Sequence, residues 1–213
     1  VNNYSAYCAW IANGNYSMAP NLLYINTNTI SGNIGYSTSS IESEGGAIFN
    51  LNNGHILIEH STITKNQAKA SGGITNRTIN TIVQIKSTLL AENIDTYGIP
   101  DCRGKITSLG FNLFGKPNVS GSGGLTCEFV SKSTDKQNIL PGIGALLIDG
   151  TVAYHPLLEN SPAFDNGGSA CPQYDARGEL RPSANACDIG AFEIQLTSNP
   201  ATKNTIFIPL MKK

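Results

Sequence analysis

The chain repeats one pattern of apolar and polar positions three times. The phrases are LYINTNTISGN at residues 23–33, HILIEHSTITKN at residues 55–66 and VQIKSTLLAEN at residues 83–93. Each phrase alternates apolar and polar residues, continues through Ser or Thr, and closes on Asn. Alternation with a period of two predicts strands rather than helices. The aligned phrases therefore predict three copies of one strand-based unit.

The alignment places apolar residues in three columns and indicates a repeat array. The columns are Leu23, Ile56 and Val83; Ile25, Ile58 and Ile85; and Ile30, Ile63 and Leu90. A second recurrence, GGAIFN at residues 45–50 and GGITN at residues 72–76, has a similar spacing. Repeats of roughly 20–50 residues are typical of solenoids. We expect an all-β, right-handed parallel β-helix whose coils stack about 4.8 Å apart. A β-sandwich is the main alternative, but it does not require columns at near-constant offset.

Asparagine closes all three phrases. Asn33, Asn66 and Asn93 are 33 and 27 residues apart. A sharp corner between strands suits Asn, which tolerates positive φ better than other residues with a side chain. Stacking then brings one amide above the next, so we predict a structural ladder of side-chain hydrogen bonds at this corner.

Composition narrows the classes of partner and site. Charged residues make up 14% of the chain and the net charge is −1, so polarity comes mainly from 23 Asn, 22 Gly and the hydroxyl residues. Such weak charge argues against a nucleic-acid partner. The sequence contains no apolar run of about 18 residues, so it predicts no transmembrane segment. The five cysteines form no CxxC pair and the three histidines do not cluster with them, so we expect no metal and no cofactor. Spaced cysteines in a chain of this composition favour an oxidising, extracellular setting.

Two stretches resemble known families. The sequence "GGAIFN…ILIEHSTITKN" resembles the right-handed β-helix repeats of bacterial polymorphic outer-membrane-type and adhesin-like proteins. The sequence DCRGKITSLGFNLFG at residues 101–115, Cys127, and SPAFDNGGSACPQYDARGELRPSANACDIGAFE at residues 161–193 resemble the choice-of-anchor Q domain. That resemblance implies a disulfide-bonded C-terminal cap on a β-helix, in a bacterial protein secreted to the cell surface. It implies location rather than chemistry.

The resemblance and closeness in sequence together predict the disulfides Cys102–Cys127 and Cys171–Cys187, with Cys8 left over. We divide the chain into β-helix coils at residues 1–115, the last coils and the cap at residues 116–193, and a tail strand at residues 194–213. The opening of the sequence and the short array suggest a fragment of a longer protein.

The predicted cap contains a charged motif that invites a catalytic interpretation. Asp175, Arg177, Arg181 and Asp188 are the residues concerned. We favour a structural clamp in which ion pairs and hydrogen bonds hold a long loop beside its disulfide. His155 is interpreted as a buried, hydrogen-bonded residue, because a lone histidine without a partner is weak support for acid–base catalysis.

The rival class is a carbohydrate-active enzyme, since polysaccharide lyases and hydrolases use this fold. Fold analogy alone is a weak argument, and glycoside hydrolysis usually needs two carboxylates about 5–9 Å apart. Acidic residues in the coils are sparse: Glu42, Glu44, Glu59, Glu92, Asp95 and Asp101. Asp95 and Asp101 near Arg103 are the only candidates for a lyase site.

The third class is a passive structural or adhesive protein, and it is the one that we favour. Open ends of a β-helix recruit other chains, so an end of the array is a candidate assembly surface. Trp10 and Tyr7 lie near one end, and Ile206, Phe207 and Ile208 form a strand-like tail. The tail NTIFIPLMKK, residues 204–213, resembles the short apolar-Pro-Leu-basic endings of some secreted bacterial proteins. Expected partners are other cell-surface proteins, copies of the chain, or a glycan.

Overall fold

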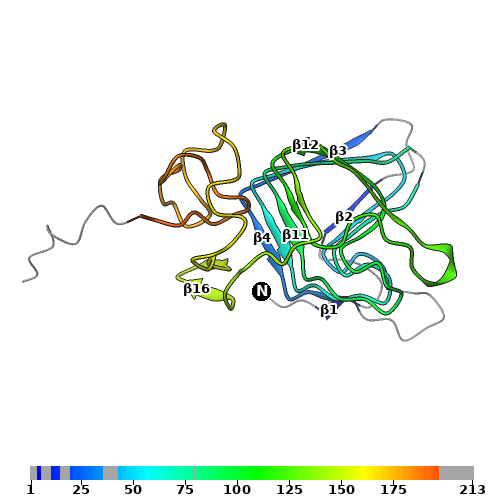
Figure 1. Cartoon of the computed structure of the whole chain (residues 1–213). Coiled ribbons are helices and arrows are strands. Elements are labelled where there is room, and N and C mark those ends of the chain that lie inside the picture. Colours follow the sequence, from blue (N-terminus) through cyan, green and yellow to red (C-terminus); the bar gives the residue numbers. More distant parts are fainter. Residues whose placement is uncertain (1–3, 6–10, 15–19, 36–42, 79, 197–213) are drawn as a thin grey trace, which may run out of the picture.

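The computed structural model describes residues 4–5, 11–14, 20–35, 43–78 and 80–196. Within these ranges nearly all regular structure is strand, and the one helix is a short 3₁₀ turn, η1 (Ser122–Gly124). The parallel sheets nearly close into a barrel-like shape (Figure 1). The strands are β1 (Tyr4–Ser5), β2 (Ile11–Asn13), β3 (Asn21–Asn26), β4 (Thr29–Ser31), β5 (Ile34–Gly35), β6 (Ile48–Asn50), β7 (Gly54–Glu59), β8 (Thr62–Thr64), β9 (Ile74–Asn76), β10 (Ile82–Lys86), β11 (Leu89–Ala91), β12 (Cys102–Gly110), β13 (Leu113–Phe114), β14 (Cys127–Val130), β15 (Lys136–Gln137), β16 (Leu147–Asp149) and β17 (Val152–Tyr154).

Two parallel sheets form the body of the molecule. The larger follows the order β2-β6-β9-β12-β10-β7-β3, with β14 beside β12, and the smaller follows β15-β13-β11-β8-β4. Successive stretches of chain therefore lie side by side as layers. We number the layers in chain order: β2–β4, β6–β8, β9–β11, β12–β13 and β14–β15.

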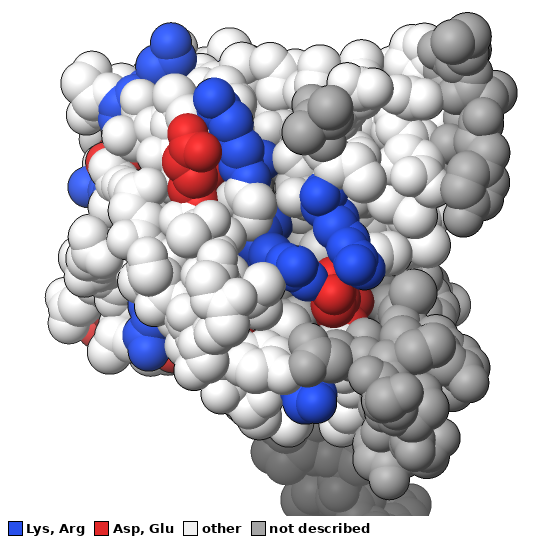
Figure 2. Space-filling view, turned by 90° about the vertical axis from the view of Figure 1, so that its right-hand side faces the viewer, with Lys and Arg blue, Asp and Glu red and all other residues white. Residues whose placement is uncertain are grey.

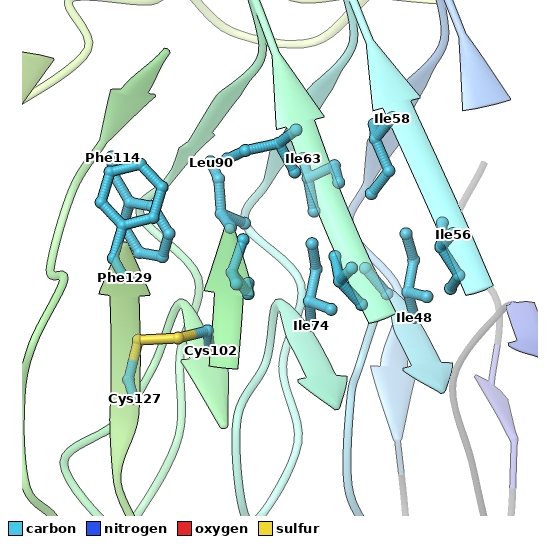
Figure 3. Close-up of a cluster of buried hydrophobic side chains, with 14 of the residues drawn as sticks. Ile48, Ile56, Ile58, Ile63, Ile74, Leu90, Cys102, Phe114, Cys127 and Phe129 are labelled. Carbon is cyan, nitrogen blue, oxygen red and sulfur yellow. A yellow bond between two sulfur atoms is a disulfide. The ribbon is translucent and has the colours of Figure 1, made fainter. Parts of the chain in front are cut away.

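The register confirms the three apolar columns. Ile56 lies between Leu23 and Val83, Ile58 lies between Ile25 and Ile85, and Ile63 lies between Ile30 and Leu90. Figure 3 shows Ile56, Ile58, Ile63 and Leu90 of these columns pointing into one shared interior. The alternation of buried and partly buried positions along β7 follows from the strand period of two. Burial of this apolar interior supplies the main driving force for folding.

The interior continues into the later layers. Ile48, Ile74 and Cys102 form a fourth buried row across β6, β9 and β12. The rings of Phe114 and Phe129 meet at 4.5 Å between centroids at the last layers (Figure 3). Aromatic side chains thus complete the buried interior where the last two layers meet.

Strand β12 bends so that it joins two parts of the larger sheet. Its first residues, Cys102 and Arg103, pair with β9. The residues from Thr107 onward pair with β10, where Thr107 lies beside Gln84. Gly104 lies at the bend with φ of 81°, and a Cβ there would lie 1.9 Å from the carbonyl oxygen of Asn76. Glycine is required at this position because both the dihedral angle and the close approach exclude a side chain.

The C-terminal segment, residues 139–196, lies against the outward face of the smaller sheet (Figure 1). Leu89 and Leu113 point outward and share a buried cluster with Leu157, Ile189 and Phe192 of the segment. We expected a cap over the end of the array. The structure places this segment along the side of the layers, where the outward residues Leu89, Ala91 and Leu113 are apolar and need covering.

Charged side chains are sparse on the surface. Figure 2 shows a face on which uncharged residues dominate and basic side chains lie close to acidic ones. The pairs in the structure include Arg103 with Glu44 at 2.5 Å and Lys105 with Glu128 at 3.6 Å. The surface therefore carries little net field, as the composition indicates.

Candidate functional sites

The predicted asparagine ladder is present beside one corner of the layers, but the expected reason for it is wrong. Positive φ falls on Gly32, Lys65 and Glu92, one residue before each asparagine, so the asparagines serve hydrogen bonding rather than the turn. Asn33 Nδ2 donates to Asn66 Oδ1 at 2.8 Å, and Asn66 Nδ2 donates to Asn93 Oδ1 at 3.0 Å. Asn93 Nδ2 then donates to Asp101 Oδ1 at 2.9 Å. An ionised carboxylate accepts but does not donate, so Asp101 ends the row. The sequence analysis named Asp101 as a candidate for a lyase site. It missed the structural role because Asp101 follows Asn93 by only eight residues, whereas the asparagines are 33 and 27 residues apart.

Asp101 is a buried carboxyl group with three donors. Besides Asn93 Nδ2, it receives hydrogen bonds from the backbone N–H groups of Asn93 at 3.1 Å and Lys116 at 2.9 Å. Its residue is 1% exposed. Burial raises the pKa of Asp101 to about 6, although the hydrogen bonds from Asn93 and Lys116 act in the opposite direction. These three hydrogen bonds join Asp101 to the ladder and to the turn at Lys116, which is a structural role.

Two further rows follow the same design at other corners. Asn13 Nδ2 donates to Asn50 Oδ1 at 3.1 Å, and Asn50 Nδ2 donates to Asn76 Oδ1 at 3.0 Å. The sequence analysis recognised the spacing of Asn50 and Asn76 as a repeat but not as a hydrogen-bonded row. A third row ends where Asp135 Oδ1 accepts from Asn112 N and Nδ2 at 2.9 and 3.0 Å. Its members differ in residue type, so alignment of the phrases could not reveal it.

Both disulfides occur with the predicted partners, but they serve different parts of the molecule. Cys171–Cys187 closes a loop within the C-terminal segment. Cys102–Cys127 joins two neighbouring layers inside the apolar interior (Figure 3). The expectation that both bonds pin the cap is therefore wrong for Cys102–Cys127. Cys8 lies outside the described residues.

The four predicted clamp residues meet in the C-terminal segment. Arg177 donates to Asp175 Oδ2 through Nε at 2.9 Å and Nη2 at 2.7 Å. Asp188 accepts from the backbone N–H groups of Asp165 and Ile194, both at 2.7 Å. Each carboxylate ties together backbone segments that are distant in sequence. This arrangement supports a structural role for the motif.

Arg177 and Arg181 close the clamp from two sides. The Arg177 guanidinium lies 3.9 Å from the centre of the Phe192 ring and 5.2 Å from that of Tyr154. Arg181 is buried, donates to the carbonyl of Gly190 at 2.8 Å, and lies 3.6 Å from a carboxylate oxygen of Glu193. Burial lowers the pKa of Arg181, and the neighbouring acidic groups oppose this shift. Burial also raises the pKa of Asp188 to about 6.

His155 is buried between the C-terminal segment and strand β4. Its Nδ1 lies 2.9 Å from the carbonyl oxygen of Gly144, so Nδ1 carries the proton. Nε2 therefore accepts from the hydroxyl of Ser31 at 2.7 Å. Burial lowers the pKa of His155, which favours the neutral form of the ring. The expectation of a buried, hydrogen-bonded histidine agrees with this geometry, and Ser31 is the partner that sequence reasoning missed.

The acidic residues considered for catalysis have structural partners instead. Asp95 accepts from the backbone N–H groups of a turn, at 2.9 Å from Ile99. Arg103 pairs with Glu44 rather than with Asp95 or Asp101. Glu92 pairs with Lys65 at 2.7 Å, and Glu59 accepts from Tyr24 at 2.7 Å. Glu42 lies outside the described residues. Within the part of the chain that the structure describes, no three His, Cys, Asp or Glu side chains gather as a metal site would require.

The outward face of β3, β7 and β10 is unusually apolar for a surface. We call it the apolar face; it consists of Leu22, Tyr24, His55, Leu57, Ile82 and Gln84. Leu22 is 75% exposed and Tyr24 is 57% exposed. A shallow pocket of about 390 Å³ follows these strands. Burial, together with the Glu59 carboxylate, raises the pKa of Tyr24 to about 12, so its hydroxyl stays protonated.

The residues predicted to form an assembly surface lie outside the described residues. They are Tyr7, Trp10, Ile206, Phe207 and Ile208. Among the described residues, no helix has the length and apolar character to cross a membrane. Comparisons with protein families, curated proteins and solved structures gave no match. Function must therefore be argued from the geometry alone.

Proposed function

We propose that this protein is a structural or adhesive protein of the cell surface, secreted by a bacterium and built as a right-handed parallel β-helix. The observation that carries the proposal is the apolar face, which exposes Leu22, Tyr24 and Ile82 on rigidly paired strands. Large exposed apolar side chains that lie together commonly mark an interaction site. Tyrosine also suits such a site because its ring gives contact area at low entropic cost.

The buried hydrogen bonds and a disulfide of the interior support the structural part of this proposal, which requires a rigid molecule. Rows of buried amides cross the layers, and Cys102–Cys127 joins two of them covalently. Hydrogen-bonded polar rows fix one register and resist slippage between strands. The C-terminal segment adds a second covalent loop against the side of the layers. The resemblance to choice-of-anchor Q domains adds the expectation of a surface location.

A glycan-binding module is the second candidate, and Tyr24 is the observation that favours it. The Tyr24 ring is exposed, and its hydroxyl is fixed by Glu59 at 2.7 Å. Gln84 lies two strands away in the same outward row. An exposed ring with polar neighbours can stack on a sugar while amide and carboxylate groups bind its hydroxyls.

The test compares binding of the whole protein to immobilised bacterial cell walls, to extracellular-matrix proteins and to an oligosaccharide array. We expect retention on at least one of these surfaces, at least tenfold weaker for Tyr24→Ala. Ile148→Ser is the matched control, because Ile148 is 71% exposed on the β16–β17 hairpin, away from the apolar face. Equal binding of both variants would refute the assigned face. Release of reducing ends or unsaturated uronides from the array would instead favour an enzyme.

A further inference from the structure

A pocket of about 520 Å³ lies where β11, β13 and β15 end, in the third, fourth and fifth layers. It is lined by stretches that are distant in sequence: residues 91–94 with 100–101, residues 115–116, and residues 138–141. All of these residues belong to the part of the chain that the structure describes. The pocket shares no lining residue with the apolar face. Its volume is in the usual range for a small-molecule site, roughly 300–1,000 Å³.

Hydrogen bonds hold two sides of this pocket in place. The Ile94 N–H donates to the carbonyl of Asn66 at 2.8 Å, and the Ile94 carbonyl accepts from the Ala68 N–H at 3.1 Å. On another side, the carbonyl of Pro141 accepts from the hydroxyl of Ser161 at 2.6 Å. The pocket is therefore formed before a ligand binds, which lowers the entropic cost of binding.

The lining exposes apolar side chains that a ligand would cover. Ile94 is 52% exposed and Leu140 is 75% exposed, and Ile139 beside Leu140 is also exposed. Pro100 and Pro141 add further apolar surface. An apolar ligand would remove this surface from water, which favours binding.

The charges of the lining leave one cation for a ligand. Glu92 is paired with Lys65 at 2.7 Å, and the buried carboxylate of Asp101 already accepts three hydrogen bonds. The Lys116 side chain is exposed and forms no ion pair or hydrogen bond with any residue that the structure describes. Its charge lowers the pKa of Asp101, but only across a distance. An anionic group would therefore pair with Lys116 without breaking an existing ion pair.

We propose that this pocket binds a small amphipathic carboxylic acid, with its apolar body against Ile94, Ile139 and Leu140 and its carboxylate on Lys116. Medium-chain fatty acids have this chemistry. The class of ligand follows from a lining that is largely apolar and contains one unpaired cation among its residues. Because the pocket is separate from the apolar face, the inference does not depend on the proposed function.

The probe is decanoate, added below its micelle concentration to the whole protein with isotope-labelled isoleucine and leucine methyl groups. NMR should show saturable shifts of the Ile94, Ile139 and Leu140 methyl signals, and no shifts of Leu22 and Ile82 on the apolar face. Decanol has the same chain length without the charge. It should bind about tenfold more weakly, because a charge-assisted hydrogen bond is lost.

Substitution of Lys116 tests the partner of the carboxylate. Lys116→Gln keeps a long polar side chain without the charge, so it should weaken decanoate binding about tenfold and leave decanol binding unchanged. Lys116→Arg keeps the charge and should retain most of the affinity. Lys132→Gln is the matched control, because Lys132 is an exposed lysine outside the pocket.

Substitution of Leu140 tests the apolar lining. Leu140→Ser should weaken the binding of decanoate and decanol alike, whereas Ile148→Ser, on the β16–β17 hairpin, should weaken neither. Equal affinity for decanoate and decanol, or unchanged affinity of Lys116→Gln, would overturn the assignment of an acid. Shifts confined to Leu22 and Ile82 would place the ligand on the apolar face and would overturn the pocket. The absence of any saturable shift would also overturn it, and would leave the proposed function standing.

Discussion

At the scale of single residues, the buried ladder amides join layers to one another, and the residue before each of them turns the corner. Asn66, the middle asparagine of the ladder, accepts two hydrogen bonds from Asn33 in one layer and donates to Asn93 in the next. The sequence predicted this use of Asn33, Asn66 and Asn93 because identical residues recur at one place in an aligned phrase. It could not predict Asp101 or Asp135 as the ends of rows, since a different residue type at a changed spacing breaks the alignment.

Replacing the middle of the ladder tests its energetic role. Asn66→Ala should lower the free energy of unfolding by about 1–3 kcal/mol, because the Asn33 and Asn93 groups lose their partners in a buried row. Urea unfolding of the whole protein measures this difference. Asn160→Ala is the control, since Asn160 is exposed in a turn and should change stability by less than about 0.5 kcal/mol. A similarly small effect for Asn66→Ala would argue against the ladder as a source of stability.

Asp101 should make stability depend on pH. Its pKa is about 6 in the folded protein against an ordinary value of 3.8, so the folded state holds the proton more tightly. Between about pH 4 and 6 the folded state therefore binds more protons, and stability falls as the pH rises. Asp101→Asn should remove this decline, which is on the order of 2 kcal/mol.

The pH dependence of the Asp101→Asn variant must be compared with that of the wild type, because other groups also titrate between pH 4 and pH 6.5. Asp188 acts in the same direction as Asp101. His60 acts in the opposite direction, because burial, with Arg181 nearby, lowers its pKa to about 4. Urea unfolding at pH 4 and pH 6.5 for Asp101→Asn, wild type and the exposed control Asp149→Asn isolates the Asp101 contribution. Parallel curves for Asp101→Asn and wild type would show that Asp101 does not couple to folding.

At the scale of elements, the C-terminal segment is held by carboxylates that accept hydrogen bonds from backbone N–H groups. Asp175 accepts from the backbone N–H groups of Arg177, Glu179 and Glu193, at 2.8, 3.1 and 3.0 Å, and from the Arg177 side chain. The sequence predicted a clamp from a motif rich in Asp, Arg and Gly. It could not predict that Phe192 and Tyr154 form the surface under Arg177, since ring stacking depends on a fold between distant segments.

Arg177→Lys tests the clamp. Lysine keeps the charge but loses the planar, forked contact with Asp175 and the contact with Phe192. We expect a loss of about 1–3 kcal/mol and faster proteolysis within residues 139–196, read by mass spectrometry. Arg77→Lys provides the matched control, because the Arg77 side chain is 53% exposed and lies 3.4 Å from Glu44. Equal proteolysis of the two variants would contradict a clamp at Arg177.

At the scale of the whole molecule, the sequence repeats predicted the apolar interior well, but they did not predict how residues 139–196 cover the smaller sheet. Columns such as Ile25, Ile58 and Ile85 come from aligned phrases in which apolar and polar residues alternate, so their shared burial could be predicted from the sequence. The position of residues 139–196 could not, because irregular chain has no period to align. The clue was the apolar outward positions Leu89 and Leu113, which a solvated sheet face would not contain.

The layers and the C-terminal segment should unfold together, because their interface is buried and hydrogen-bonded. Thr62 Oγ1 accepts from Ala191 N at 3.0 Å, and Ser87 Oγ donates to the carbonyl of Gly167 at 2.8 Å. Thr62→Val keeps the shape of the side chain but removes the acceptor, so it should destabilise both parts equally, by about 1 kcal/mol. Hydrogen exchange at increasing urea, compared between β8 and residues 185–193, measures the two parts separately. Thr151→Val, an exposed control, should change neither. Opening of residues 185–193 at clearly lower urea than β8 would show instead that the segment is an independent unit resting on the layers.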